Sequence, residues 1–185
     1  MIPEIKKKTE DRMKGALEAL RHEFSTIRTG RASLSLLDDV KVDYYGTPSP
    51  LSQIATLALP DARTITIQPW ETKMLGPIEK SLMKSDIGVS PVNDGRIIRL
   101  VMPQLTEERR KELAKRAKKM AEDSKVGIRN VRRDSNEALK KAEKDKAITE
   151  DDLKKSEQEI QKMTDEYIKR VDEALVHKEK EIMEV

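Results

Sequence analysis

The sequence predicts an α+β protein, in which an elongated antiparallel three-helix bundle carries a small β-rich α/β-sandwich domain inserted into its first connection. Apolar residues recur every three or four positions in both terminal parts of the chain, and this period vanishes in the middle. Seven of the eight prolines lie between Pro48 and Pro103. Charged residues make up 38% of the chain and aromatic residues 3%, which is typical of long solvated helices with aliphatic cores.

The first two helices follow from this periodicity. Residues 3–28 form a one-faced helix, and Thr29-Gly30 ends it, because glycine easily takes the left-handed conformation found at helix ends. Residues 107–145 form a second helix without internal breaks, ~58 Å long at about 1.5 Å per residue. Its apolar seam consists of Leu113, Ala117, Met120, Ser124, Ile128, Val131, Ser135, Ala138 and Ala142.

A third helix follows a short turn. Thr149 and Asp152 have the spacing of a capping box, which begins a helix by satisfying its first backbone N–H groups. Its apolar face carries Leu153, Ile160, Met163, Tyr167, Val171, Leu175 and Ile182. Because none of the three helices can bury its apolar face alone, we expect them to pack as an up-down-up bundle.

The middle of the chain predicts strands around one short helix. Residues 40–45 alternate apolar and polar side chains as a half-buried strand does, and Gly46-Thr47-Pro48 reads as the following turn. Three more β-branched runs follow, together with a helix that carries Leu75, Ile78, Leu82 and Met83 on one side. We expect Trp70 to pack in this domain. The runs span residues 54–59, 63–67 and 96–102, and the helix residues 74–84.

These elements give two domains. The bundle takes residues 1–30 and 105–185, and the inserted domain takes residues 31–104. The chain crosses between them near residues 29–31 and 103–105, so Thr29, Gly30, Pro103 and Gln104 could act as a hinge. Rigid linkers at the same positions are the alternative.

Positive charge is concentrated on the second helix. The net charge is +6 over residues 105–133 and −5 over residues 134–185. At about 100° per residue, seven cations fall within roughly 60° of one line that faces away from the apolar seam, interrupted only by Glu122. We call them the basic stripe: Lys111, Lys115, Lys118, Lys125, Arg129, Arg132 and Arg133.

The basic stripe suggests a polyanionic partner. It lacks the acids four residues away that an ordinary solvated helix face carries, although such a face remains the alternative. Guanidinium groups bind phosphates through two N–H groups at once, which suits the run from Arg129 to Arg133. No aromatic side chains alternate with these arginines, so folded RNA fits better than single strands, and DNA is a weaker alternative without a base-reading motif.

Other function classes are less well supported. The chain has no Cys and no GxSxG, HExxH or P-loop motif, and His22 and His177 fall on outward helix faces, so we expect no enzyme, metal or cofactor. A helical scaffold protein would need a second exposed apolar stripe, which the sequence does not show. Without an apolar leader or a run of about 20 apolar residues, we expect a cytoplasmic monomer.

Four segments resemble the bacterial ribosome recycling factor family, in the family's order and across essentially the whole chain. They are Arg28-Thr29-Gly30-Arg31-Ala32, Tyr44-Tyr45-Gly46-Thr47-Pro48, Leu105-Thr106-Glu107-Glu108-Arg109-Arg110 and Arg129-Asn130-Val131-Arg132-Arg133-Asp134. Together they are highly specific, whereas one alone would be weak. Ile128 and Ser135, which flank the last segment, are mild departures from the residues common there.

The resemblance implies an L-shaped molecule that binds 23S rRNA of the large ribosomal subunit. Together with elongation factor G and the GTP that this partner uses, it would drive the ribosomal subunits apart and release mRNA after termination. It would need no catalytic groups of its own. Arg132 matches the arginine most closely tied to subunit binding in the family. The supporting residues would be Arg129, Arg133, Lys125, Lys118, Arg110, Arg28 and Arg31.

Overall fold

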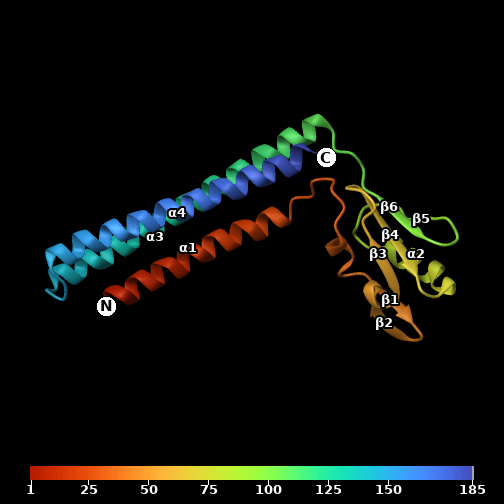
Figure 1. Cartoon of the computed structure of the whole chain (residues 1–185), viewed down its shortest axis with the longest axis horizontal. Helices are drawn as coiled ribbons and strands as arrows, with labels where there is room; N and C mark the ends of the chain where they lie inside the picture. The colour runs from red at the N-terminus through yellow and green to blue at the C-terminus, as the bar shows by residue number, and fades with distance from the viewer. Residues whose placement is uncertain (185) are drawn as a thin grey trace. The chain divides into compact units, whose positions relative to one another are not determined.

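The computed structural model describes residues 1–184, and its mixture of long helices with small antiparallel sheets confirms the α+β class. Contacts within the chain divide it into two compact units, each described by itself below. The helical unit comprises Met1–Arg28 and Glu107–Glu184, and the inserted unit comprises Thr29–Thr106. Figure 1 labels the helices and strands of both.

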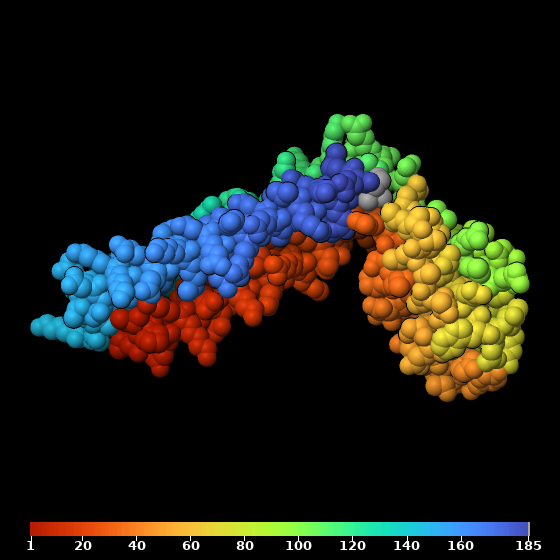
Figure 2. All heavy atoms as spheres, in the orientation of Figure 1, coloured from red at the N-terminus to blue at the C-terminus, as the bar shows by residue number. Residues whose placement is uncertain are grey.

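Three helices form the helical unit, and each contacts the other two. They are α1 (Ile2–Ser25), α3 (Glu107–Lys144) and α4 (Glu150–Met183). The α3 helix has 38 residues and α4 has 34, so the predicted long helices are present. In Figure 2 the atoms of α4 lie directly on those of α1 along most of their length.

The buried seam of α3 follows the predicted pattern with two shifts of one residue, of which the first places Ala121 in the core where Met120 was expected. Leu113, Ile128 and Val131 are buried, but Ala138 is exposed and its neighbour Leu139 is fully buried instead. The step from Ser135 to the next core position is therefore four residues, which keeps the seam on one side of a helix with 3.6 residues per turn.

The first helix ends earlier than its sequence suggests. We expected the helix to end at Thr29-Gly30, but α1 ends at Ser25 and Thr26 is its C-cap residue. The hydroxyl groups of Ser25 and Thr26 donate to the carbonyl oxygens of His22 and Glu23, both at 2.6 Å, and thereby satisfy backbone groups that the last turn leaves free.

The turn between α3 and α4 has a defined cap on each side. The backbone N–H of Ala147 donates to the carbonyl oxygen of Ala142, and that of Lys146 donates to the carbonyl oxygen of Glu143. These two hydrogen bonds form a Schellman motif, in which Lys146 takes the left-handed conformation (φ 57°) that glycine usually takes. On the other side, Thr149 and Asp152 form the predicted capping box. These caps fix α4 antiparallel to α3.

A hairpin opens the inserted unit. It pairs β1 (Lys41–Tyr44) with β2 (Thr47–Pro50) through a turn at Tyr45 and Gly46, whose φ angles are 51° and 82°. The turn that was expected at Gly46-Thr47-Pro48 includes Gly46 but lies one residue earlier, and Thr47 and Pro48 belong to a strand. Two positive φ angles match the twist of a tight hairpin, and proline is tolerated because β2 is an edge strand.

A four-stranded antiparallel sheet and one helix build the rest of this unit. The strand order is β3 (Ala55–Ala58), β4 (Thr64–Pro69), β6 (Ile98–Val101), β5 (Val92–Asn93). Three short 3-10 helices, η1 (Leu34–Leu37), η2 (Leu51–Gln53) and η3 (Thr72–Met74), connect these elements. The helix α2 (Leu75–Lys84) contributes Leu75, Ile78 and Leu82 to a core shared with Ile65, Ile67, Ile98 and Leu100.

Two apolar side chains expected in this core lie outside it. Met83 is 63% exposed, because the next position after Leu82 is turned by about 100° around the helix. Trp70 is 64% exposed, and its Nε1 donates to Thr56 Oγ1 at 3.0 Å on the sheet face opposite the core. The small domain therefore buries neither of them.

Glu71 ties the hairpin to the segment before η3. Its carboxylate accepts hydrogen bonds from Tyr44, and from Tyr45 at 2.8 Å, and lies 3.1 Å from Lys73 Nζ. The Lys73 ammonium also lies 4.5 Å from the centroid of the Tyr45 ring. Hydrogen bonds from Tyr44, Tyr45 and Lys73 lower the pKa of Glu71 from its ordinary value to about 2.

This pKa predicts a pH dependence of stability. A lowered folded-state pKa means that Glu71 stabilises the inserted unit above its unfolded-state pKa of about 4.3, and that this contribution disappears as pH falls toward 2. Urea unfolding from pH 5 to 2, followed by Trp70 fluorescence, measures it. Glu71→Gln should flatten the profile, whereas Glu79→Gln, a matched change on α2, should not. Parallel profiles for wild type and Glu71→Gln would contradict the account.

Candidate nucleic-acid interface

The basic stripe lies on α3 but is not free of acids. Lys111 Nζ lies 2.9 Å from Glu107, four residues earlier, so the expectation that no such partner exists was wrong. Glu122, expected only to interrupt the stripe, lies 3.7 Å from Lys125 and 3.2 Å from Arg129. Part of the stripe is therefore neutralised by its own helix.

Two cations of the stripe also pair with acids of α4. Lys118 lies 3.5 Å from Glu179, and Lys125 lies 2.6 Å from Asp172. The side chain of Lys125 is only 18% exposed. The stripe thus does not face away from the bundle along its whole length, because its edge borders the acidic helix α4.

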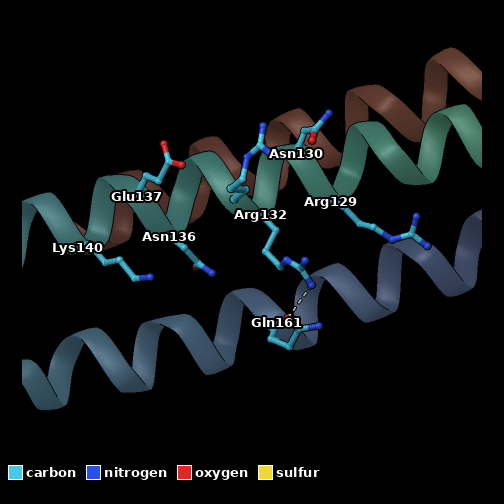
Figure 3. A pocket seen from close by; sticks show the side chains of 8 residues that line it. Arg129, Asn130, Arg132, Asn136, Glu137, Lys140 and Gln161 are labelled. Atoms are coloured by element: carbon cyan, nitrogen blue, oxygen red, sulfur yellow. Dashed lines mark hydrogen bonds between the residues drawn. The ribbon is translucent and has the colours of Figure 1, made fainter.

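A groove between α3 and α4 contains the arginine end of the stripe (Figure 3). Its volume is about 420 Å³. In Figure 3, Arg129, Arg132, Asn136 and Lys140 point from α3 toward α4, where Gln161 faces them. We call this the Arg132 groove, and it is lined by Arg129, Asn130, Arg132, Arg133, Asn136, Glu137, Lys140 and Gln161.

Two of the three arginines in the groove have no acidic partner in the part of the chain that the structure describes. Arg132 Nη1 donates to the neutral Gln161 Oε1 at 3.0 Å, and within residues 1–184 neither Arg132 nor Arg133 has a carboxylate at ion-pair distance. Arg129 pairs with Glu122, but both side chains are about half exposed, and such pairs are worth only about 0.2–1 kcal/mol. A phosphate group could therefore displace Glu122 at little cost.

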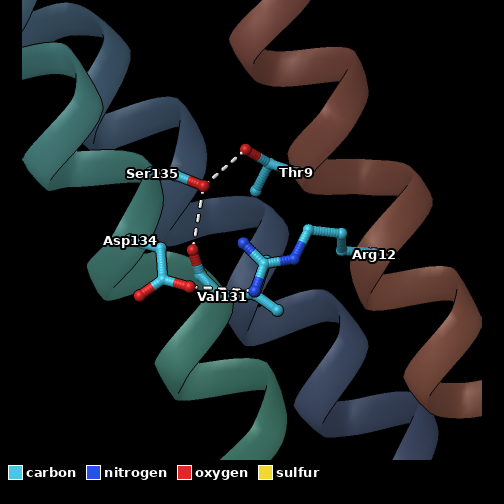
Figure 4. A network of polar contacts seen from close by, with 5 residues as sticks. All are labelled: Thr9, Arg12, Val131, Asp134 and Ser135. Atoms are coloured by element: carbon cyan, nitrogen blue, oxygen red, sulfur yellow. Dashed lines mark hydrogen bonds and ion pairs between the residues drawn. The ribbon is translucent and has the colours of Figure 1, made fainter.

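The acid next to Arg133 is held by another helix. Asp134 accepts from Arg12 Nη2 of α1 at 2.8 Å (Figure 4). Beside this pair, the buried hydroxyl groups of Thr9 and Ser135 lie 2.6 Å apart, and Ser135 also lies within 2.8 Å of the Val131 carbonyl oxygen. These contacts fix α1 against α3.

Amide and ammonium groups extend the groove beyond the arginines. Asn136 lines the groove, and its Oδ1 is buried and has no hydrogen-bond partner among the described residues. Lys140 Nζ lies 3.9 Å from Glu157 of α4. Guanidinium groups for phosphates beside an amide for hydroxyl or amino groups are the chemistry that folded RNA requires.

The structure brings together only some of the predicted site residues. Arg129, Arg132 and Arg133 line one groove, whereas Lys118 and Lys125 pair with acids of α4. Arg110 lies in the first turn of α3 and donates to the Met183 carbonyl oxygen at 3.3 Å. Arg28 and Arg31 are exposed, the first in the helical unit and the second in the inserted unit.

The sequence prediction missed Asn136, Lys140 and Gln161. Asn136 and Lys140 fall on the same angular line as the stripe, so the helical periodicity could have included them. Gln161 belongs to another helix, and only the packing of α4 on α3 reveals it. Among the described residues there is no cluster of three or more potential metal ligands and no helix that could span a membrane.

Comparisons with known proteins agree on one family. The model of the family "Ribosome recycling factor" matches residues 20–183. The ribosome-recycling factor of Oleidesulfovibrio alaskensis is 60% identical over 177 residues, 96% of either chain. That of Caldicellulosiruptor saccharolyticus is 55% identical over 184 residues, 100% of either chain.

Two solved structures are similar to the whole chain. A solution structure of the ribosome recycling factor has a TM-score of 0.75 and 38% identity, covering 100% of this chain and 98% of the other. A T. thermophilus ribosome recycling factor, described with E. coli elongation factor G bound to the E. coli post-termination complex, has a TM-score of 0.62 and 43% identity. It covers 99% of either chain.

The pairing pattern predicts different roles for two cations of the stripe. Arg133→Ala should lower the slope of log affinity for folded RNA against log salt concentration by about one, without changing stability. Lys125→Ala should lower the free energy of unfolding by up to ~1 kcal/mol, because two carboxylates lose their partner. Filter binding at several salt concentrations and urea unfolding measure both. An equal loss of slope in the two variants would contradict this division.

Proposed function

Because the chain belongs to the ribosome recycling factor family, we propose that it binds the large ribosomal subunit after termination and, with elongation factor G and GTP, splits the post-termination complex, releasing ribosomes from mRNA. The observation that carries this proposal is the Arg132 groove. There, Arg132 and Arg133 remain unneutralised in a protein whose other stripe cations mostly pair with acids. Phosphates of 23S rRNA would complete their coordination.

The relatives support the partners. A similar ribosome recycling factor is described with elongation factor G on a post-termination complex. In our proposal the free energy for splitting comes from GTP on that partner, and this chain supplies a grip on rRNA and a stiff element, without a cofactor or catalytic group. The α3 helix, 38 residues long and packed against two other helices, suits such a mechanical role. We propose a cytoplasmic monomer.

The pivot for this motion would lie where the two linking segments of the inserted unit meet. Thr29 is buried, and Gly30 has a φ of 76°. A Cβ atom at Gly30 would lie 3.2 Å from Leu105 Cγ and 3.4 Å from the Pro103 carbonyl oxygen. We propose that Thr29, Gly30, Pro103 and Gln104 together form the hinge.

A helical scaffold protein is the competing function. It would bury a continuous apolar stripe against a helical partner. In the described part of the helical unit, only four large apolar side chains are exposed, one before α1, one on α3 and two on α4, which is too few for a continuous stripe. They are Met1, Val126, Val176 and Met183.

The groove is tested by Arg132→Ala. This variant should bind large ribosomal subunits more weakly, with a salt slope lower by about one, because one phosphate contact is lost. Its unfolding should be unchanged. Lys141→Ala is a matched control, since it removes an exposed cation from another face of α3. Co-sedimentation with large subunits at several salt concentrations measures the affinity of both variants. Wild-type binding by Arg132→Ala would contradict the proposal.

The hinge is tested by Gly30→Val. A left-handed φ costs a β-branched residue about 1–3 kcal/mol, so we expect normal subunit binding but splitting slowed by about tenfold. Gly95→Val is the control, because Gly95 has a φ of 90° in open space. Light scattering of post-termination complexes with elongation factor G and GTP measures the rate. Unchanged splitting by Gly30→Val would argue against a moving joint.

A further inference from the structure

Two ion pairs between α3 and α4 lie seven residues apart along each helix. Lys118 pairs with Glu179 at 3.5 Å, and Lys125 pairs with Asp172 at 2.6 Å. This step advances seven residues along α3 and goes back seven along α4, as expected for antiparallel helices packed side by side. The next step of this series would pair Arg132 with Asp165.

At this step the ion pair is replaced by a neutral bridge. Arg132 Nη1 donates to Gln161 Oε1 at 3.0 Å (Figure 3). Gln161 Nε2 in turn donates to Asp165 Oδ1 at 2.8 Å. The amide of Gln161 thus stands between the guanidinium and the carboxylate. Beyond it, Lys140 and Glu157 form a further ion pair between the two helices, at 3.9 Å.

The bridge changes what Arg132 offers to a ligand. A carboxylate paired directly with a guanidinium would compete with phosphate for the same charge and the same N–H groups. A neutral amide takes one of the five N–H groups and leaves the positive charge and the other donors in place. Asp165, meanwhile, has its own hydrogen-bond donor in Gln161 Nε2.

The same separation occurs at the neighbouring arginine by a different route. Asp134, the acid next to Arg133 in the chain, is held by Arg12 of α1 at 2.8 Å. Asp134 and Asp165 are therefore both engaged by other side chains. Elsewhere along the stripe, at Lys118 and Lys125, acids of α4 pair directly with the cations.

We propose that Gln161 is a positioning residue for rRNA binding: it keeps Asp165 away from Arg132 and holds the guanidinium in the groove for a phosphate. This inference rests on the proposed function. Gln161 makes no ion pair and need not touch RNA, because its effect passes through Arg132 and Asp165.

Removing the bridge should let Asp165 neutralise Arg132. Gln161→Ala is expected to weaken binding to large ribosomal subunits about fivefold, the factor that corresponds to ~1 kcal/mol for an exposed ion pair that now competes. Its salt slope should fall toward that of Arg132→Ala. The double variant Gln161→Ala/Asp165→Asn should bind within about twofold of wild type, since the competing carboxylate is gone.

The rescue separates positioning from mere structural support, because Asp165→Asn would not restore a bundle that Gln161→Ala had loosened. Gln158→Ala, an exposed glutamine of α4 outside the groove, is the control and should bind as wild type. Thermal unfolding of all variants is measured in parallel.

Two results would overturn the inference while leaving the proposed function intact. One is wild-type binding by Gln161→Ala when Arg132→Ala is weak, and the other is weak binding by Gln161→Ala that Asp165→Asn does not restore. Wild-type binding by Arg132→Ala in the same assay would instead overturn the proposed function and this inference together.

Discussion

The burial of one face of α3 against α1 and α4 fixes the direction of every charged side chain on that helix. Leu113, Ala117 and Ile128 are almost completely inaccessible to solvent, so α3 cannot rotate about its axis without exposing them. The line of cations that borders α4 is thereby held in place. The long helix is both the centre of the core and the carrier of the proposed RNA-binding groups.

Packing also decides which of these cations stay available. Those that border acids of α4 are neutralised, as Lys125 is by Asp172, whereas Arg132 meets an amide. The difference is local, since the chain has a net charge of only +3. When protein cations neutralise phosphates, the counterions condensed on the nucleic acid are released, and this release favours binding. A few unpaired guanidinium groups in one groove therefore matter more for affinity than the total charge of the protein. This makes the groove, and not the whole stripe, the proposed point of contact.

The sequence predicted what short-range patterns determine. Apolar periodicity located α3 and α4, and the spacing of Thr149 and Asp152 located the capping box. The strand β2 was missed because prolines argue against a strand unless its edge position is known. The partners of Lys118 and Lys125, and the role of Gln161, depend on the register of α4 against α3, which the periodicity of either helix alone leaves open. For the same reason the stripe was expected to be more exposed than it is.

The central claim is that the groove between α3 and α4 receives rRNA. A cryo-electron microscopy map of the protein on the large ribosomal subunit, resolving side chains of α3, tests it most directly. The account predicts a backbone phosphate within hydrogen-bond distance of the Arg132 guanidinium, with Gln161 still between that arginine and Asp165. A map in which this groove faces solvent, and another surface of the helical unit contacts the rRNA, would contradict it.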